Sequence, residues 1–301
     1  MRTVYLGTSD FAATVLRRLA ASRHRPLLVV TPPDRPKGRG RRSGPPPVAE
    51  VAIELDLDLL QAEDVNAEPA LERIRATQPE AAAVCAFGQL IREPLLSELP
   101  LLNVHPSLLP RWRGAAPIER AIMAGDERTG VSIMRLTAGL DSGPVAMREE
   151  IGIGPEDDFE GLAGKLATLG GDLLVEALDL EEKGMLSFVE QDEGGLVYAE
   201  KIDSAERRLD PARPAAELAR TVRALTPHVG AYLEIGGDSR LGVRRARAVD
   251  VGVTAGKFKS EWGALLLGCG RGALRLEVVQ PAGGKPMAAD AYLRGHSVPS
   301  L

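Results

Sequence analysis

Three polar side chains of this sequence could together carry out acyl transfer: the amide of Asn103, the imidazole of His105 and the carboxylate of Asp141. The first two lie in the segment Asn-Val-His-Pro-Ser-Leu-Leu-Pro, and the third lies in Gly-Leu-Asp-Ser-Gly. An amine that attacks an acyl carbon needs an acceptor for its proton and donors directed at the oxygen that becomes negative. An amide, an imidazole and a carboxylate can fill these roles without a metal or a covalent nucleophile.

The local sequence indicates where Asn103 and His105 point. If residues 101–105 form a strand, side chains two residues apart share a face, so the two project together. The strand is expected to end at Pro106, which has no N–H for the ladder. A polar pair is costly inside a core, whereas the rim of a parallel α/β sheet is where such folds keep their sites. The pair is therefore predicted to mark the functional edge of a sheet.

Each member of this trio also has a structural interpretation. His105 alone fits a hydrogen-bonded histidine at a strand end, and Asp141 fits a turn residue that caps its own backbone. A serine hydrolase would combine Ser107 with the same two residues, but Ser107 does not lie in a Gly-x-Ser-x-Gly elbow. The histidines are scattered, and neither His-Glu-x-x-His nor Cys-x-x-Cys occurs, so we predict no metal site.

Apolar periodicity predicts an α/β fold for the first part of the chain. Strand patterns at residues 3–7 and 27–31 flank a helical pattern at 11–20, which forms a βαβ unit and implies a parallel sheet. Further strand patterns at 81–87 and 101–104 extend it, so we expect a doubly wound, Rossmann-like, mostly parallel sheet. The first turn, Gly-Thr-Ser-Asp, lacks the Gly-x-Gly-x-x-Gly pattern of dinucleotide sites.

The second part of the chain has a different pattern. After an amphipathic helix at 168–183, a polar stretch that contains Gly194 and Gly195 is typical of a linker. A helix at about 210–224 is then followed by short apolar runs between Gly and Asp turns, which is typical of a small β-barrel. The predicted division is a catalytic domain at 1–189, a linker at 190–208 and a second domain at 209–301.

Composition excludes several classes of protein. The 301 residues are 44% hydrophobic, as in ordinary globular proteins, and no apolar run approaches the roughly 18 residues of a membrane span. The first residues enter a strand pattern rather than a signal peptide, so we expect a cytoplasmic protein. Cys85 and Cys269 lie far apart in apolar contexts and are predicted to be buried free thiols.

The charge is unevenly distributed. Residues 1–202 carry 22 Lys and Arg against 32 Asp and Glu, a net −10, whereas 203–301 carry 15 against 10, a net +5. Such asymmetry indicates a polyanionic partner, although the charge distribution alone slightly favours a solvated surface in an Arg-rich composition. In the second part, Arg245 and Arg247 fall two apart in an expected strand and share a face. That face fits either a nucleic-acid platform or edge charges that prevent aggregation.

The Gly- and Pro-rich segment 31–47 is expected to be a long mobile loop at the edge of the sheet where ligands bind. It is either a solvated insertion or a functional loop whose cations meet a phosphate backbone. The five cations fall within eight residues and are Arg35, Lys37, Arg39, Arg41 and Arg42.

The sequence resembles the methionyl-tRNA formyltransferases, whose catalytic domain is shared with other enzymes that use 10-formyltetrahydrofolate. The run at 103–118, Asn-Val-His-Pro-Ser-Leu-Leu-Pro-Arg-Trp-Arg-Gly-Ala-Ala-Pro-Ile, carries most of the resemblance. Supporting matches along the whole chain are residues 7–11, 33–36, 38–40, 124–126, 129–131, 139–143, 198–202 and 280–283. The chain departs from the family pattern at Ser9, at Pro106 and at 226–229.

The resemblance implies roles for individual residues. Asn103, His105 and Asp141 would be the catalytic trio. The backbone around 86–90, with Phe87 and Gly88, would bind the pterin, and Arg39 would hold the acceptor tRNA. The second domain would be an OB-like barrel that also binds tRNA. The rest of the folate site would be lined by Ser107, Leu108, Leu109 and Pro110.

The implied reaction is transfer of the formyl group of 10-formyltetrahydrofolate to the α-amino group of methionine on initiator methionyl-tRNA, which serves translation initiation. We expect a monomer with folate and tRNA as partners and no membrane association. Two alternatives remain at this point: a formyltransferase that acts on a small amine, and a tRNA-binding protein that has lost the activity. The cationic loop and basic barrel argue against the first, and the intact trio argues against the second.

Overall fold

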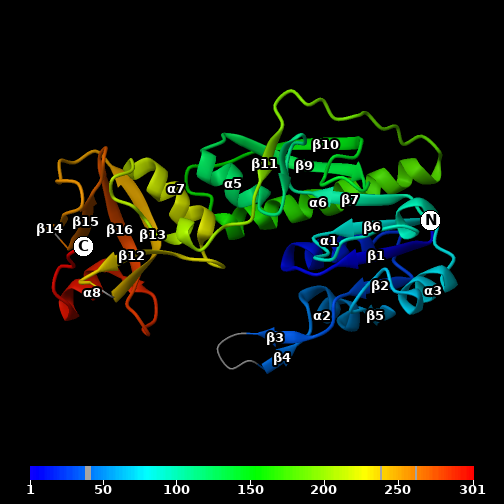
Figure 1. Ribbon diagram of the computed structural model, residues 1–301, viewed down its shortest axis with the longest axis horizontal. Coiled ribbons are helices and arrows are strands. Elements are labelled where there is room, and N and C mark those ends of the chain that lie inside the picture. Colours follow the sequence, from blue (N-terminus) through cyan, green and yellow to red (C-terminus); the bar gives the residue numbers. More distant parts are fainter. Residues whose placement is uncertain (38–41, 238, 262) are drawn as a thin grey trace. The chain divides into compact units, whose positions relative to one another are not determined.

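The computed structural model describes residues 1–37, 42–237, 239–261 and 263–301. It contains two compact units, which are drawn in Figure 1. The predicted boundaries 1–189, 190–208 and 209–301 stay a prediction. The compact units are not continuous in sequence, since residues 115–127 and 153–162 group with the C-terminal part. The first unit comprises residues 1–114, 128–152 and 163–198, and the second comprises 115–127, 153–162 and 199–301.

A seven-stranded sheet forms the centre of the first unit, in the order β10-β9-β7-β6-β1-β2-β5. The strands from β7 to β5 run parallel, whereas β9 is antiparallel to both β7 and β10. The expected mostly parallel α/β sheet is therefore confirmed. The strands are β1 (Thr3–Gly7), β2 (Leu28–Thr31), β5 (Leu59–Gln61), β6 (Ala81–Cys85), β7 (Leu101–His105), β9 (Arg128–Arg135) and β10 (Val145–Gly152).

Helices connect these strands. The first begins after Ser9, whose hydroxyl accepts a hydrogen bond from the N–H of Ala12, as an N-cap does. One apolar core of this unit gathers buried side chains of β1, β2, β6 and α3. The helices are α1 (Asp10–Ala20), α2 (Pro47–Glu54), α3 (Glu68–Ala76), α4 (Leu95–Glu98) and the long α6 (Phe159–Glu182), which begins in the second unit.

Two glycines allow α6 to pack closely. A Cβ at Gly170 would lie 2.7 Å from Val104 Cγ1, in the strand that carries Asn103 and His105. A Cβ at Gly171 would lie 2.7 Å from Arg18 on α1. The sequence predicted a helix only over 168–183, because glycine lowers helix propensity and several glycines interrupt the pattern. Close packing against β7 and α1 explains their presence.

The second unit is built around an antiparallel sheet in the order β12-β13-β16-β15-β14, with β17 paired to β16. Its apolar core lies between this sheet and α7. This agrees with the expected small β domain. The elements are α5 (Pro117–Ala124), η1 (Ala205–Arg207), α7 (Ala215–Leu225), β12 (Ala231–Ile235), β13 (Ser239–Val249), β14 (Phe258–Glu261), β15 (Ala264–Gly268), β16 (Ala273–Gln280), β17 (Met287–Ala288) and α8 (Ala289–Gly295).

The segment predicted to be a mobile loop contains two short strands, β3 (Arg35–Lys37) and β4 (Arg42–Gly44), which pair antiparallel. Side-chain periodicity did not indicate this hairpin, because the pairing uses backbone groups that any sequence possesses. A second two-stranded sheet pairs β8 (Arg111–Gly114) with β11 (Val197–Ala199).

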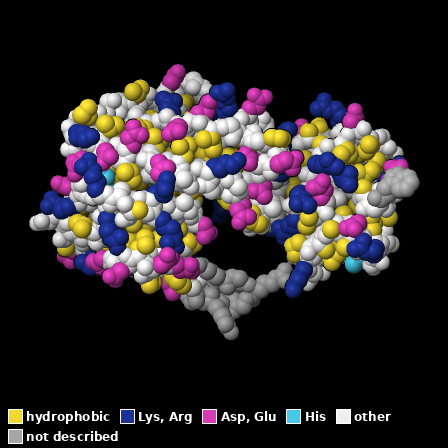
Figure 2. All heavy atoms as spheres, turned by 180° about the vertical axis from the view of Figure 1, so that it is seen from behind, with side chains coloured by type: hydrophobic (Ala, Val, Ile, Leu, Met, Phe, Trp, Pro, Cys, Tyr) yellow, Lys and Arg dark blue, Asp and Glu magenta, His cyan; other side chains and the backbone are white. Residues whose placement is uncertain are grey.

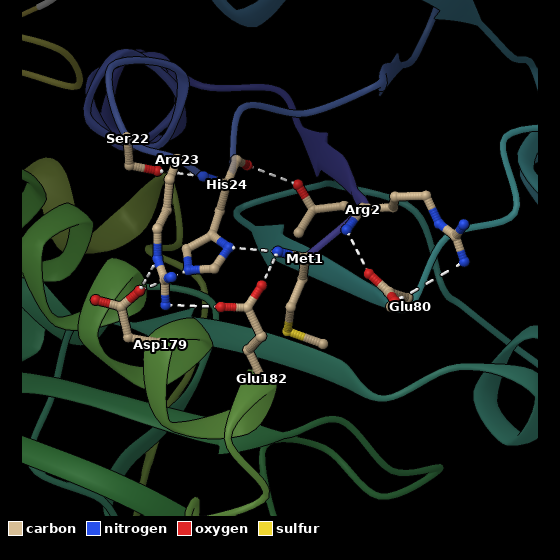
Figure 3. Close-up of polar contacts among 9 residues, drawn as sticks. Met1, Arg2, Ser22, Arg23, His24, Glu80, Asp179 and Glu182 are labelled. Atoms are coloured by element: carbon tan, nitrogen blue, oxygen red, sulfur yellow. Dashed lines mark hydrogen bonds and ion pairs between the residues drawn. The ribbon is translucent and has the colours of Figure 1, made fainter.

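A polar network joins the start of β1 to the end of α6 (Figure 3). The Met1 amino group lies 3.0 Å from His24 Nδ1 and donates to Glu182 at 2.6 Å. His24 is fully buried, and its Nε2 lies 2.8 Å from Asp179 Oδ1, which also accepts from Arg23. Hydrogen bonds from His24 and Arg23 lower the pKa of Asp179 below its usual value.

We expect Asp179→Asn to lower the melting temperature at neutral pH. Because the pKa of Asp179 is lowered in the folded state, its stabilising effect is fully present above the unfolded value of about 3.9. That contribution disappears as the pH falls through the folded-state pKa, so the difference from the wild type should shrink below about pH 4. Thermal unfolding at a series of pH values measures this, with Glu176→Gln as an exposed control on the same helix. A difference that does not change with pH would contradict the assignment.

Charged side chains of both signs are interspersed over the face drawn in Figure 2. Exposed ion pairs of the protein include Arg17 with Glu54 and Arg75 with Glu98. Exposed pairs of this kind contribute little to stability. Among the helices of the described residues, none has the length and apolar character needed to cross a membrane.

Candidate active site

The strand β7 carries Asn103 and His105 at its carboxyl-terminal end, in the sheet of the first unit. It lies between β6 and β9, and every residue of the strand is buried. Asn103 is 8% exposed and His105 is 5% exposed. The Asn103 carboxamide forms no hydrogen bond with any residue that the structure describes, so its N–H₂ group remains available as a donor.

The imidazole of His105 is oriented by a backbone carbonyl. Its Nε2 lies 2.9 Å from the carbonyl oxygen of Trp112. A carbonyl oxygen only accepts hydrogen bonds, so Nε2 carries the proton in this contact. In the neutral ring, Nδ1 is therefore the nitrogen with a free lone pair. It lies 3.6 Å from Asp141 Oδ2, at ion-pair rather than hydrogen-bond distance.

Asp141 is fixed by contacts on its carboxylate and on its backbone. Its Oδ2 accepts a hydrogen bond of 2.9 Å from the N–H of Gly114. Asp141 has a φ of 45°, in the left-handed region that few residues other than glycine adopt. Two residues later, a Cβ at Gly143 would lie 2.0 Å from the carbonyl oxygen of Arg135, so only glycine fits there. The structure thus brings the whole predicted trio together within the first unit.

The segment 107–110 forms a braced turn after β7. The Ser107 hydroxyl donates to the carbonyl of Arg111 at 2.7 Å, so it is engaged within the turn. Leu109 is fully buried beside Met134 and Val145, whereas Leu108 and Pro110 are partly exposed. Arg148 donates to the carbonyl of Leu109 at 2.8 Å and holds the turn in place.

A second segment, 86–91, follows β6, next to β7 in the sheet. Ala86 and Gly88 both have positive φ and are exposed, whereas Phe87 is buried and its carbonyl accepts a hydrogen bond from Thr8. Gln89 anchors the segment through the N–H of Val65 and the carbonyl of Ala62. The backbone at Ala86 and Gly88 is thus presented in a fixed conformation at the edge of the sheet that carries Asn103.

Neither cysteine belongs to the trio, and both are buried. Burial raises the pKa of the Cys85 thiol to about 12, so it stays protonated at neutral pH, and Cys269 is buried as well. In the part of the chain that the structure describes, no three His, Cys, Asp or Glu side chains are grouped as a metal would require.

The predicted basic residues are described only in part. Arg35 is exposed in β3, whereas Arg39 and Arg41 lie outside the described residues, and Lys37 and Arg42 are described by their backbone alone. In the second unit, Arg245 and Arg247 are both exposed on one face of β13. They share a single carboxylate: their Nε atoms lie 2.9 Å and 3.2 Å from the two oxygens of Glu277.

The sequence did not predict the backbone groups that contact His105 and Asp141. The carbonyl of Trp112 and the N–H of Gly114 are not visible in residue types, and only their place in the family-like run 103–118 could have drawn attention to them. Gln191, whose amide donates to the carbonyls of Asp141 and Gly143, fell in the segment interpreted as a linker.

Known protein families match both parts of this chain. The formyl transferase family model matches residues 1–178, and the model of the formyl transferase C-terminal domain matches 201–297. The chain is 43% identical over 300 residues to a methionyl-tRNA formyltransferase of Methylobacterium sp. (strain 4-46), which covers 98% of this chain and 96% of that protein. It is 41% identical over 302 residues to the methionyl-tRNA formyltransferase of Methylococcus capsulatus, covering 99% and 98%.

Solved structures share the fold at low sequence identity. HypX from Aquifex aeolicus in complex with tetrahydrofolic acid matches 97% of this chain and 47% of that chain, with a TM-score of 0.66 and 17% identity. An N-formyltransferase from Helicobacter canadensis, in complex with folinic acid and dTDP-3-aminofucose, matches 92% of this chain and 98% of that chain, with a TM-score of 0.68 and 12% identity. The two domain matches and the near full-length similarity lead to one conclusion: the chain belongs to the methionyl-tRNA formyltransferase family.

Proposed function

We propose that this chain transfers the formyl group of 10-formyltetrahydrofolate to the α-amino group of methionine on initiator methionyl-tRNA. The observation that carries the proposal is the arrangement of the trio: Asn103 and His105 at the end of β7, with Asp141 3.6 Å from the imidazole. The similarity of the whole chain to methionyl-tRNA formyltransferases supports this choice of donor and acceptor. We further propose that the enzyme is a monomer and that it acts in the cytoplasm, where tRNA is found.

The trio supplies the groups that this reaction needs. The bound folate supplies the formyl carbon and a nitrogen that can leave. Asn103 donates its free N–H to the formyl oxygen as negative charge develops there. The lone pair of His105 Nδ1 accepts the proton of the attacking amine, and the imidazolium then donates it toward the leaving nitrogen. Asp141 stabilises the positive charge on His105 during these steps.

The residues after β6 and β7 fit a folate. A pterin presents N–H and C=O groups along one edge, which pair well with backbone groups. The exposed backbone at Ala86 and Gly88, held by Gln89, offers such groups, so we assign the pterin contact to the segment that includes Phe87 and Gly88. The turn made of Ser107, Leu108, Leu109 and Pro110 would complete the folate site, with Leu108 and Pro110 as its accessible side chains.

The tRNA contacts are assigned to two basic surfaces. Arg35, Lys37, Arg39, Arg41 and Arg42 would meet the acceptor end, and Arg245 and Arg247 would meet the phosphate backbone. Because Glu277 lies within 3.2 Å of both of the latter, that carboxylate offsets one of the two positive charges. The pair therefore offers a net charge of about one to a phosphate.

We expect Arg247→Ala to reduce the salt dependence of tRNA binding. Each phosphate contact contributes about one counterion, so the slope of log K against log salt should fall by roughly one. Binding titrations with methionyl-tRNA at several salt concentrations measure the slope. Arg294→Ala removes the same charge from α8 of the second unit and serves as the control. Equal slopes for the two variants would argue against a role for Arg247.

The proposed acceptor can be tested by a comparison of substrates. Formylation of methionyl initiator tRNA, methionyl elongator tRNA and free methionine is followed with radiolabelled 10-formyltetrahydrofolate. We expect efficient transfer only to the initiator tRNA. Equal rates with free methionine, or transfer only to a small amine such as a nucleotide-linked amino sugar, would contradict the proposed acceptor.

A further inference from the structure

We infer that Gln191 is a positioning residue, which holds Asp141 in place beside His105. This inference rests on the proposed formyl transfer. Every polar atom of the Gln191 side chain is engaged: its Nε2 donates to the carbonyl of Asp141 at 2.9 Å and to that of Gly143 at 2.7 Å. Its Oε1 accepts from Arg113 Nε at 2.9 Å. The Gln191 side chain therefore links the backbone of the Asp141 turn to Arg113.

The segment that carries Gln191 is itself fixed against the sheet. Val189 and Val145 exchange two backbone hydrogen bonds, of 2.8 Å and 2.9 Å, as a single antiparallel bridge. Antiparallel register places residue 191 opposite residue 143, two positions beyond the bridge on each strand. One residue before Val189, the ring of Phe188 lies under the guanidinium of Arg135, 4.1 Å from it. The pairing of Val145 with Val189 thus places Gln191 opposite Gly143, where its amide donates to the Gly143 carbonyl.

Arg113 fixes the other end of the Gln191 amide. It is only 7% exposed and lies in β8 between Trp112 and Gly114, whose backbone groups bind His105 and Asp141. Because the Arg113 guanidinium can only donate hydrogen bonds, the Gln191 amide must turn its oxygen toward Arg113. That orientation directs both amide hydrogens at the turn. One strand therefore holds the imidazole, the carboxylate and the residue that positions the carboxylate.

The Asp141 turn needs such a residue. The φ of 45° at Asp141 is strained for a residue with a Cβ, and strained turns persist only when their surroundings hold them. Gly139 and Gly143 flank the turn and add no side-chain packing of their own. Loss of the two bonds from Gln191 would let the carboxylate move away from His105, and small displacements of catalytic groups have large effects on rate.

Gln191→Met and Gln191→Glu test this role. Methionine keeps the length but removes all three hydrogen bonds, whereas glutamate keeps the acceptor for Arg113 and removes both donors. We expect each variant to lose about 100-fold in kcat for methionyl-tRNA, with KM changed less than about threefold. The control is Glu190→Ala, an exposed neighbour, which should retain wild-type kinetics. Melting temperatures show that the variants are folded.

A double-mutant cycle separates positioning from a general loss of structure. If Gln191 acts through Asp141, Gln191→Met in an Asp141→Asn background should lower kcat less than about threefold further. Additive losses in the double variant, or either single variant within threefold of the wild type, would overturn the inference. An inactive wild-type enzyme would instead refute the proposed function, so the two failures are distinguishable.

Discussion

Asn103→Ala is expected to lower kcat by about 10²- to 10³-fold, or about 2.7–4 kcal/mol of transition-state stabilisation. Asn103 has the one carboxamide of the trio, and its N–H₂ group makes no hydrogen bond with the described residues, so it is free to meet the formyl oxygen. Binding of both substrates should change little, because the bond strengthens as charge develops. Steady-state kinetics with methionyl-tRNA and 10-formyltetrahydrofolate measure the effect.

Asn103→Asp is the matched comparison, because it keeps the size of the side chain and replaces the donor by an acceptor. It should be at least as impaired as Asn103→Ala. The alanine variant should not unfold at a much lower temperature, since the wild-type amide has no hydrogen-bond partner to lose among the described residues. The aspartate variant places a carboxylate at a position that is only 8% exposed, so its melting temperature is measured alongside its kinetics. Near-normal kcat in the alanine variant would remove Asn103 from the mechanism.

His105→Ala is expected to show a loss of the same order, about 10²- to 10³-fold in kcat. The lone pair of Nδ1, which lies 3.6 Å from Asp141 Oδ2, is the proton acceptor that the imidazole offers to the attacking amine. His105→Gln can still donate to the carbonyl of Trp112 but cannot accept and return a proton.

The glutamine variant therefore distinguishes support of the turn from proton transfer. If His105 served only to hold Trp112, His105→Gln would restore much of the activity that His105→Ala loses. We expect both variants to be equally impaired. Rates should be compared over a range of pH, since a proton acceptor imposes a pH dependence that the variants lack.

The sequence predicted the sheet from local apolar periodicity, and the trio from residue types within short segments. The two-residue period of a strand and the stop at Pro106 place Asn103 and His105 on one face, and the structure has both in β7. The predicted strand 101–104 ends one residue before the observed β7, which extends to His105. The helix predicted at about 210–224 begins too early, since α7 starts only after Pro214. Propensity alone does not locate such boundaries.

The rest depends on contacts between distant parts of the chain. The 3.6 Å approach of Asp141 to His105 requires the N–H of Gly114, and residue types do not reveal which backbone group will serve. Gln191 was hidden in a polar, glycine-containing segment, where composition favours a linker. Its function follows from the Val145–Val189 bridge, a long-range pairing that periodicity does not encode. The sharing of Glu277 by Arg245 and Arg247 is a similar case.

The fate of the formyl group in a single turnover tests the proposed transfer to methionyl-tRNA. Wild-type enzyme is mixed with 10-formyltetrahydrofolate, labelled in the formyl carbon, and methionyl initiator tRNA in the presence of a chelator, and the amino acid is then released from the tRNA. We expect labelled formylmethionine, formed at a rate that the chelator does not change. Label that remains on the folate, or that reaches the tRNA only when a metal is added, would contradict it.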